Sequence, residues 1–160
     1  MRLRLVAVAS LLYLSSHLTV AVAQEWITYQ SVSYNIQFDI PSDWDTEVDE
    51  ETLIASGDNA VFVIAAIENA GNSAEELFEI QVETLEFDFE GEYDEIELAG
   101  GIYGLIGTGA AIIEDDDVDI IILAATSDEM GYLAYIFSEP DASDKDWDVM
   151  VDIITSLAPL

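Results

Sequence analysis

The segments AVFVIAAI (60–67) and DIIILAAT (119–126) decide the fold, because both carry apolar residues at almost every position. A strand with one solvent-exposed face alternates apolar and polar residues, so a strand that is apolar throughout must be covered on both faces. We therefore expect a β-sheet with other elements packed against both sides of these two strands.

The surrounding sequence predicts further strands and the turns between them. YNIQFDI (34–40) alternates cleanly until Pro41, and residues 41–44 form a turn that returns Trp44 to the fold. Gly57-Asp58-Asn59 separates two apolar segments and is a hairpin signal. The other expected strands are 26–30, 52–56, 102–113, 118–125 and 130–137. The last three are joined by connections too short for parallel crossovers, which predicts antiparallel pairing.

Two amphipathic helices complete the expected fold. Ser73 and Glu76 match a capping box, and the helix that follows is expected to end at Gly91. Its apolar stripe is Ala74, Leu77, Phe78, Val82, Leu85 and Phe89. Ser143 is expected to cap a final helix, whose apolar stripe is Trp147, Met150, Val151, Ile154 and Leu157. The predicted class is α+β, an antiparallel β-sheet flanked by helices with one on each face.

The first 23 residues are predicted to be a signal peptide. Arg2 and Arg4 precede an apolar run, and Ala21-Val22-Ala23 supplies the small residues of a cleavage site. Residues 24–160 would then form a single exported domain in the extracellular space, the periplasm or the cell envelope. No membrane insertion is expected after cleavage, because no later apolar run is long enough to span a bilayer. An uncleaved leader would instead act as an anchor.

The composition of residues 24–160 excludes several classes of function. They hold all 34 acidic residues and one base, Lys145, and the whole chain has a formal net charge of −31. This charge repels phosphate backbones and anionic lipids, so we expect no nucleic-acid binding. The chain has no cysteine, and its one histidine, His17, lies in the leader. The acidity is explained either by adaptation to salty surroundings or by recruitment of cations or of a basic partner. Its spread along the chain favours salt adaptation.

Several short motifs, in this order, resemble the PsbP-like family. They are IPSDW (40–44), IEN (67–69) before a capped helix, GGIYG (100–104) and IITSL (153–157). The resemblance covers about residues 29–160 and implies a bacterial exported member with the Mog/PsbP/DcrB-like fold, an α/β/α sandwich. It also implies an accessory, non-catalytic role. Members that dock on photosystems use basic residues, of which residues 24–160 offer only Lys145, and the histidines proposed for the family's metal sites are absent from residues 24–160.

The densest acidic stretch, EDDDVD (114–119), is the candidate metal site. Asp115, Asp117 and Asp119 fit the opening of a calcium loop. However, Ile120 stands where that loop requires glycine, and Thr126 stands where it requires a bidentate glutamate. A solvated hairpin turn is the favoured interpretation, with weak Ca²⁺ binding as the alternative and no other cofactor expected.

No catalytic residue is predicted. A serine or cysteine nucleophile needs a base, and residues 24–160 contain no histidine. Four aspartates near Lys145 in the sequence indicate a solvated lysine rather than a Schiff-base nucleophile. The glycines of 100–109 precede no helix, so they predict a bent or bulged strand rather than a phosphate loop. We therefore expect a non-catalytic accessory or interaction domain with an unknown protein partner. The alternatives are a carboxylate-based Ca²⁺-binding protein and an all-carboxylate hydrolase.

Overall fold

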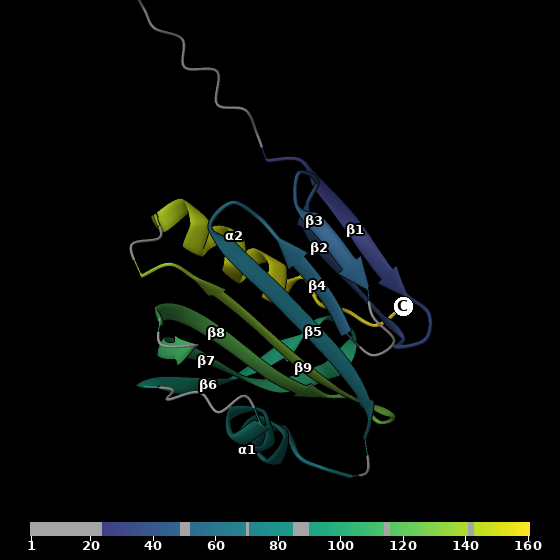
Figure 1. Cartoon of the computed structure of the whole chain (residues 1–160). Helices are drawn as coiled ribbons and strands as arrows, with labels where there is room; N and C mark the ends of the chain where they lie inside the picture. Colours follow the sequence, from purple (N-terminus) through teal and green to yellow (C-terminus); the bar gives the residue numbers. More distant parts are fainter. Residues whose placement is uncertain (1–23, 49–51, 70, 85–89, 114–115, 141–142) are drawn as a thin grey trace, which may run out of the picture.

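The computed structural model of the chain describes residues 24–48, 52–69, 71–84, 90–113, 116–140 and 143–160. These residues form a mostly antiparallel β-structure with two α-helices, which confirms the predicted α+β class (Figure 1). The leader predicted over 1–23 lies outside the described residues and stays a prediction.

A seven-stranded sheet forms the body of the molecule, in the order β3-β4-β5-β9-β8-β7-β6, with every neighbouring pair antiparallel. Its strands are β3 (Asp45–Val48), β4 (Thr52–Ser56), β5 (Ala60–Glu68), β6 (Glu90–Leu98), β7 (Ile102–Ile113), β8 (Asp116–Thr126) and β9 (Met130–Ser138). The predicted hairpin at Gly57 is present, and the backbone N–H of Gly57 donates to the carbonyl of Ala60 at 2.9 Å.

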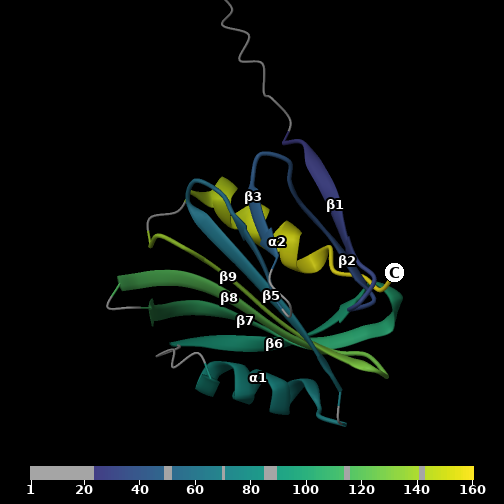
Figure 2. The ribbon, with the colours of Figure 1, turned by 45° about the vertical axis from the view of Figure 1, so that its right-hand side comes forward.

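The two faces of the sheet are covered by different elements. Helix α2 (Asp144–Thr155) packs against the face formed by alternate residues such as Phe62, Ile121 and Ile136. Helix α1 (Ala74–Thr84) packs against the opposite face, where Leu77 and Phe78 join a second buried cluster. In Figure 2 the sheet runs between α1 and α2. Residues 120–125 of β8 are completely buried, so this strand is covered on both faces as predicted.

A separate two-stranded hairpin shares the α2 side of the sheet. Strands β1 (Trp26–Ser31) and β2 (Ile36–Pro41) pair with each other, and the ring of Phe38 lies 5.3 Å from that of Phe62. The backbones of Gln37 and Ala158 exchange two hydrogen bonds, of 2.8 and 2.9 Å. The C-terminal residues are therefore held against β2, beside the core (Figure 1).

The predicted capping box at Ser73 is present, and the predicted cap at Ser143 is also part of a capping box. The Ser73 backbone N–H donates to the carboxylate of Glu76 at 2.8 Å, and the Glu76 backbone N–H donates to the Ser73 hydroxyl at 3.2 Å. Ser143 and Asp146 make the same reciprocal pair at the start of α2. These side chains satisfy amide groups that would otherwise lack partners in the first turn.

Strands β3 and β6 were not predicted. Both are rich in acidic residues, so the apolar alternation that marks a strand is weak. The prediction that Gly91 ends the first helix is wrong, because α1 ends at Thr84 and Gly91 lies within β6. Leu85 and Phe89, expected on the apolar stripe of that helix, lie outside the described residues.

Three further expectations need correction. Strand β5 is buried on one face only, because Val61, Val63 and Ala65 are half-buried on the other. Trp147 is likewise half-buried, and the completely buried residues of α2 include Ile153, which the predicted stripe omitted. Of the predicted bent or bulged strand at residues 100–109, the bulged alternative is wrong, because the pairing of β7 with β6 and β8 is continuous. Gly104 instead allows close contact, since a Cβ there would lie 2.7 Å from the Ala124 carbonyl oxygen.

Replacing Ile153 tests the packing of α2. Because its side chain is completely buried in the core cluster, we expect Ile153→Ala to lower the free energy of unfolding by about 2–5 kcal/mol. Asp148→Ala, on an exposed position of the same helix, is the control and should change it by less than about 0.5 kcal/mol. Urea unfolding followed by circular dichroism measures both. Equal effects would contradict the orientation of α2 described here.

We expect the free energy of unfolding to stay constant between about pH 6 and 9 and to fall at alkaline pH. Burial raises the pKa of Tyr132, partly offset by a hydrogen bond with the Ser127 side chain, and burial also raises the pKa of Tyr135. The unfolded chain therefore loses these protons first, and stability falls as the pH rises above about 10. Residues 24–160 contain no histidine or cysteine, so no side chain has an ordinary pKa between about pH 6 and 9.

Tyr132→Phe should reduce the alkaline fall in the free energy of unfolding relative to the wild type, because it removes one of the two tyrosines whose pKa is raised by burial. Urea titrations of the wild type and the variant at a series of pH values measure both slopes. A steep change between about pH 6 and 9, or equal alkaline slopes in the wild type and the variant, would contradict this expectation.

Candidate functional site

The predicted metal ligands lie on the hairpin between β7 and β8. Asp117 is exposed, Asp119 is half-buried two residues along β8, and Asp115 lies outside the described residues. Pairing of Ile113 with Asp116 confirms the predicted hairpin. In the described part of the chain, no group of three or more potential ligands is arranged to hold a metal ion. Weak Ca²⁺ binding by Asp117 and Asp119 therefore stays a prediction.

Carboxylates from separate parts of the chain meet at one end of the sheet, where β5 begins and β9 ends. Two adjoining hollows lie there, and both are lined by residues 57–60. We call this region the acidic end and define it by the carboxylates that line the hollows: Asp43, Asp45, Asp58, Asp116, Asp117, Glu139 and Asp146. Lys145 is the only lysine or arginine after Arg4 in the sequence, and it lines one of the hollows.

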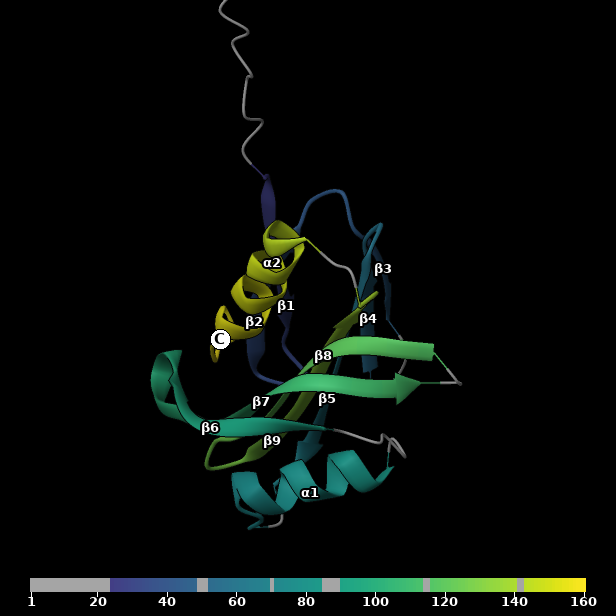
Figure 3. The same cartoon turned by 90° about the vertical axis from the view of Figure 1, so that its left-hand side faces the viewer.

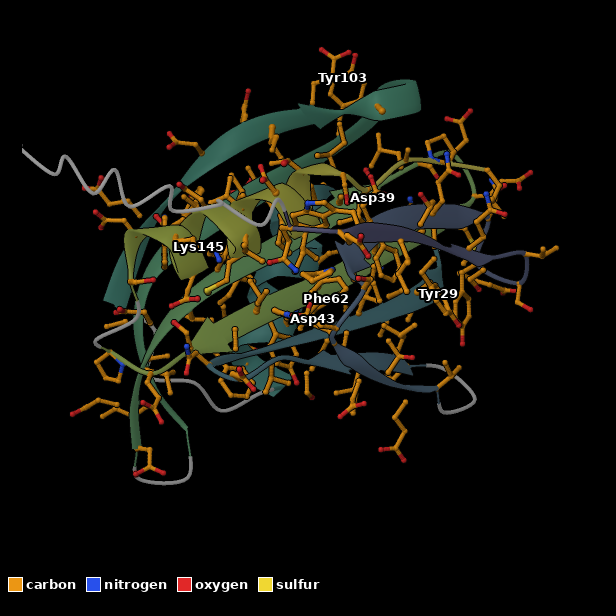
Figure 4. The ribbon with its side chains drawn as sticks, turned by 90° about the horizontal axis from the view of Figure 1, so that it is seen from above. Tyr29, Asp39, Asp43, Phe62, Tyr103 and Lys145 are labelled. Atoms are coloured by element: carbon orange, nitrogen blue, oxygen red, sulfur yellow. The ribbon has the colours of Figure 1, made fainter. Side chains whose placement is uncertain are left out.

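The smaller hollow, of about 320 Å³, lies between the turn after β2 and the start of α2. The half-buried indole of Trp44 lines it and packs over the backbone of Gly57, where a Cβ would lie only 2.5 Å from the ring. Glycine is therefore required at position 57 to seat the tryptophan. Asp43 and Lys145 both line this hollow, and Figure 4 labels each of them.

The larger hollow at the acidic end, of about 630 Å³, has apolar and acidic parts. Val61, Val118 and Phe137 give it an apolar lining, and Asp58, Asp116, Asp117 and Glu139 supply carboxylates. Ser138 also lines it: this residue is 2% exposed, and its hydroxyl has no hydrogen-bond partner among the residues that the structure describes. The hollow therefore combines negative charge with apolar contact area.

A third concavity, of about 820 Å³, lies between the first turn of α1 and strands β6 and β7. Its lining includes Tyr93 and Tyr103, which are 53% and 60% exposed, and the Tyr103 hydroxyl lies 3.5 Å from a carboxylate oxygen of Glu97. In Figure 4, Tyr103 lies well apart from Asp43 and Lys145. This concavity was not predicted, because β6, which supplies much of its lining, was not predicted.

The chemistry available at the acidic end is electrostatic. A concave surface lined by one sign of charge concentrates the opposite charge, so the hollows attract cations and basic side chains. The carboxylates lie on strands β3 and β8, on helix α2, in the turn that follows β2, in the β4–β5 hairpin and in the segment that follows β9. Only the fold brings them together.

Comparisons with known proteins identify the fold. No protein-family model and no curated protein sequence matches this chain. The solution structure of cyanobacterial PsbP from Synechocystis is similar, with a TM-score of 0.66 at 9% identity, over 92% of this chain and 99% of that one. The chain has the PsbP-like fold.

Two other structures share the PsbP-like fold of this chain at low identity. LpqN of Mycobacterium tuberculosis, a protein involved in cell envelope biogenesis, has a TM-score of 0.52 at 11% identity, over 85% of this chain and 91% of LpqN. A Bacteroides thetaiotaomicron protein has a TM-score of 0.58 at 11% identity. That match covers 83% of this chain but only 48% of the longer protein. The PsbP-like fold does not by itself define an activity.

A comparison of sodium with calcium separates screening from specific binding. Because the chain is strongly acidic, we expect the melting temperature to rise with ionic strength for either cation, with calcium exceeding sodium only through its charge. Melting curves at matched ionic strength, for the wild type and Asp117→Asn, measure this. A saturating calcium shift below about 1 mM that vanishes in the variant would instead establish a metal site.

Proposed function

We propose that this protein is an exported, non-catalytic accessory domain that binds a positively charged protein partner through its acidic end. The observation that carries the proposal is the convergence of carboxylates from separate segments around two adjoining hollows. The larger hollow also offers apolar contact, which suits a protein side chain better than a hydrated ion.

One consideration supports a binding role, and another supports a location in the cell envelope or outside the cell. Residues 24–160 lack the histidine and cysteine with which many active sites act as base or nucleophile. The envelope role of LpqN, which shares the fold, agrees with export. Within the described residues, no helix is long and apolar enough to cross a membrane.

The proposed architecture is the α/β/α sandwich that the resemblance implied. Its support is that α1 and α2 belong to two different buried clusters, which contain alternate residues of the same strands. This arrangement leaves the acidic end at a rim of the sheet, where loops rather than packed layers form the surface.

Titration with a synthetic oligolysine tests the proposal, with tryptophan fluorescence as the readout because Trp44 lines the smaller hollow. We expect saturable binding that weakens about tenfold between low and physiological salt. The double variant Asp58→Asn/Asp116→Asn should bind at least about fivefold more weakly, since each removed charge lies at the acidic end.

The matched control is Glu79→Gln/Glu83→Gln, which removes the same charge from exposed positions on α1. It should bind within about twofold of the wild type. Equal weakening in the two double variants would mean that oligolysine responds only to net charge, and it would overturn a localised site.

A further inference from the structure

The face of the sheet that carries α1 is only partly covered by that helix. Beside α1 lies a strip of six apolar residues, which we call the open strip: Ile54, Val61, Val63, Ala65, Tyr135 and Phe137. Val63 pairs with Ile54 on one side and with Tyr135 on the other, while Val61 pairs with Phe137. Because directly paired residues point to the same side of a sheet, these side chains form one continuous surface.

The open strip differs sharply from the opposite face of the same strands. There Phe62 and Ile64 are at most 5% exposed, whereas on the strip Ile54 is 37% exposed and Val61 and Val63 are half-buried. Helix α1 packs chiefly on β8, with further contacts to β7 and β9. In Figure 3 it lies beneath that part of the sheet, with β3 and β4 clear of it.

Acidic side chains border the open strip. Glu47 is paired with Ile54 and therefore lies on the same face, at the edge strand. At the other side of the strip, Val61 and Phe137 line the same hollow as Asp116 and Glu139. An apolar strip bordered by carboxylates is complementary to an apolar surface bordered by lysine or arginine.

We propose that the open strip is the docking surface for a cationic amphipathic helix supplied by another protein, which would lie on the sheet beside α1. This proposal rests on the proposed function and adds to it the surface and the chemical class of the partner. A helix is the occupant because sheet faces are covered by helices in this class of fold, and α1 already covers the neighbouring strands.

The dimensions of the open strip suit a helix. Val61 and Ala65 are four residues apart on β5, a distance of about 13 Å, which corresponds to about two and a half helical turns. The docked helix would present apolar residues at positions i, i+3, i+4 and i+7 to the strip and basic residues to the carboxylates at its borders.

Charge argues against the two other occupants. A second copy of this chain would bring another formal charge of −31 against the same acidic borders, which like-charge repulsion disfavours. An anionic membrane surface is repelled for the same reason.

The test uses two synthetic peptides of about 18 residues, both built from leucine and lysine in the same proportions. One places leucine at helical spacing, and the other has a permuted order that forms no apolar face. Isothermal titration calorimetry at physiological salt measures both with the whole protein. We expect the amphipathic peptide to bind at least about tenfold more tightly, because only it presents a continuous apolar face.

Variants locate the binding surface. Ile54→Ser should weaken binding of the amphipathic peptide about fivefold or more, and Ile112→Ser, at a position on β7 that is 46% exposed, should leave it within about twofold. Val63→Thr makes the open strip more polar at nearly constant side-chain volume and should also weaken binding. The surface can therefore still be tested if Ile54→Ser does not fold. Thermal melting confirms that each variant is folded.

Equal binding of the two peptides, or equal effects of the strip variants and Ile112→Ser, would overturn the open strip as a docking surface. If those results came with weaker oligolysine binding by Asp58→Asn/Asp116→Asn, the acidic end would still be a binding site and only this further inference would fail. Dimerisation at micromolar concentration that Ile54→Ser abolishes would replace the helix with a second copy of the chain.

Discussion

Strand β8 buries residues 120–125 completely, on both of its faces, and the positions of the other elements follow from that burial. A strand inside two hydrophobic layers needs a paired strand on each side and a covering element above and below. Strands β7 and β9 supply the pairing, α1 covers one face, and α2 with β2 lies on the other. Because the chain has no cysteine, the packing of apolar side chains and the backbone hydrogen bonds hold this arrangement without disulfides.

The strong negative charge and the apolar core are kept apart by the sheet and the helices. Glutamates of α1 such as Glu75 and Glu79 are exposed, while Leu77 and Phe78 on the same helix are buried. At the acidic end this separation is incomplete, because Val61 and Phe137 line a hollow together with Asp116 and Glu139. Carboxylates beside accessible apolar side chains are the combination on which the proposed binding role of this end rests.

Local sequence signals predicted most of the elements but not all of them. The capping boxes at Ser73 and Ser143 and the hairpin at Gly57 act over a few residues, so the sequence alone is sufficient to identify them. Strand β6 was missed because a strand at the edge of a sheet tolerates acidic residues, which remove the expected alternation. The groove containing Tyr93 was missed with it.

By itself the sequence determined the α+β class, the antiparallel pairing of the last strands and the burial of residues 120–125 of β8 on both faces. It also excluded histidine and cysteine chemistry from residues 24–160. Only the tertiary structure decided which carboxylates meet and which apolar face stays open. Asp43, Asp116 and Asp146 are far apart in the chain, and the pairing of the strands together with the packing of α2 brings them to one end. Strand β5 is as apolar as β8, but α1 packs mainly on β7, β8 and β9. The position of β5 in the sheet, rather than its composition, therefore leaves one of its faces accessible.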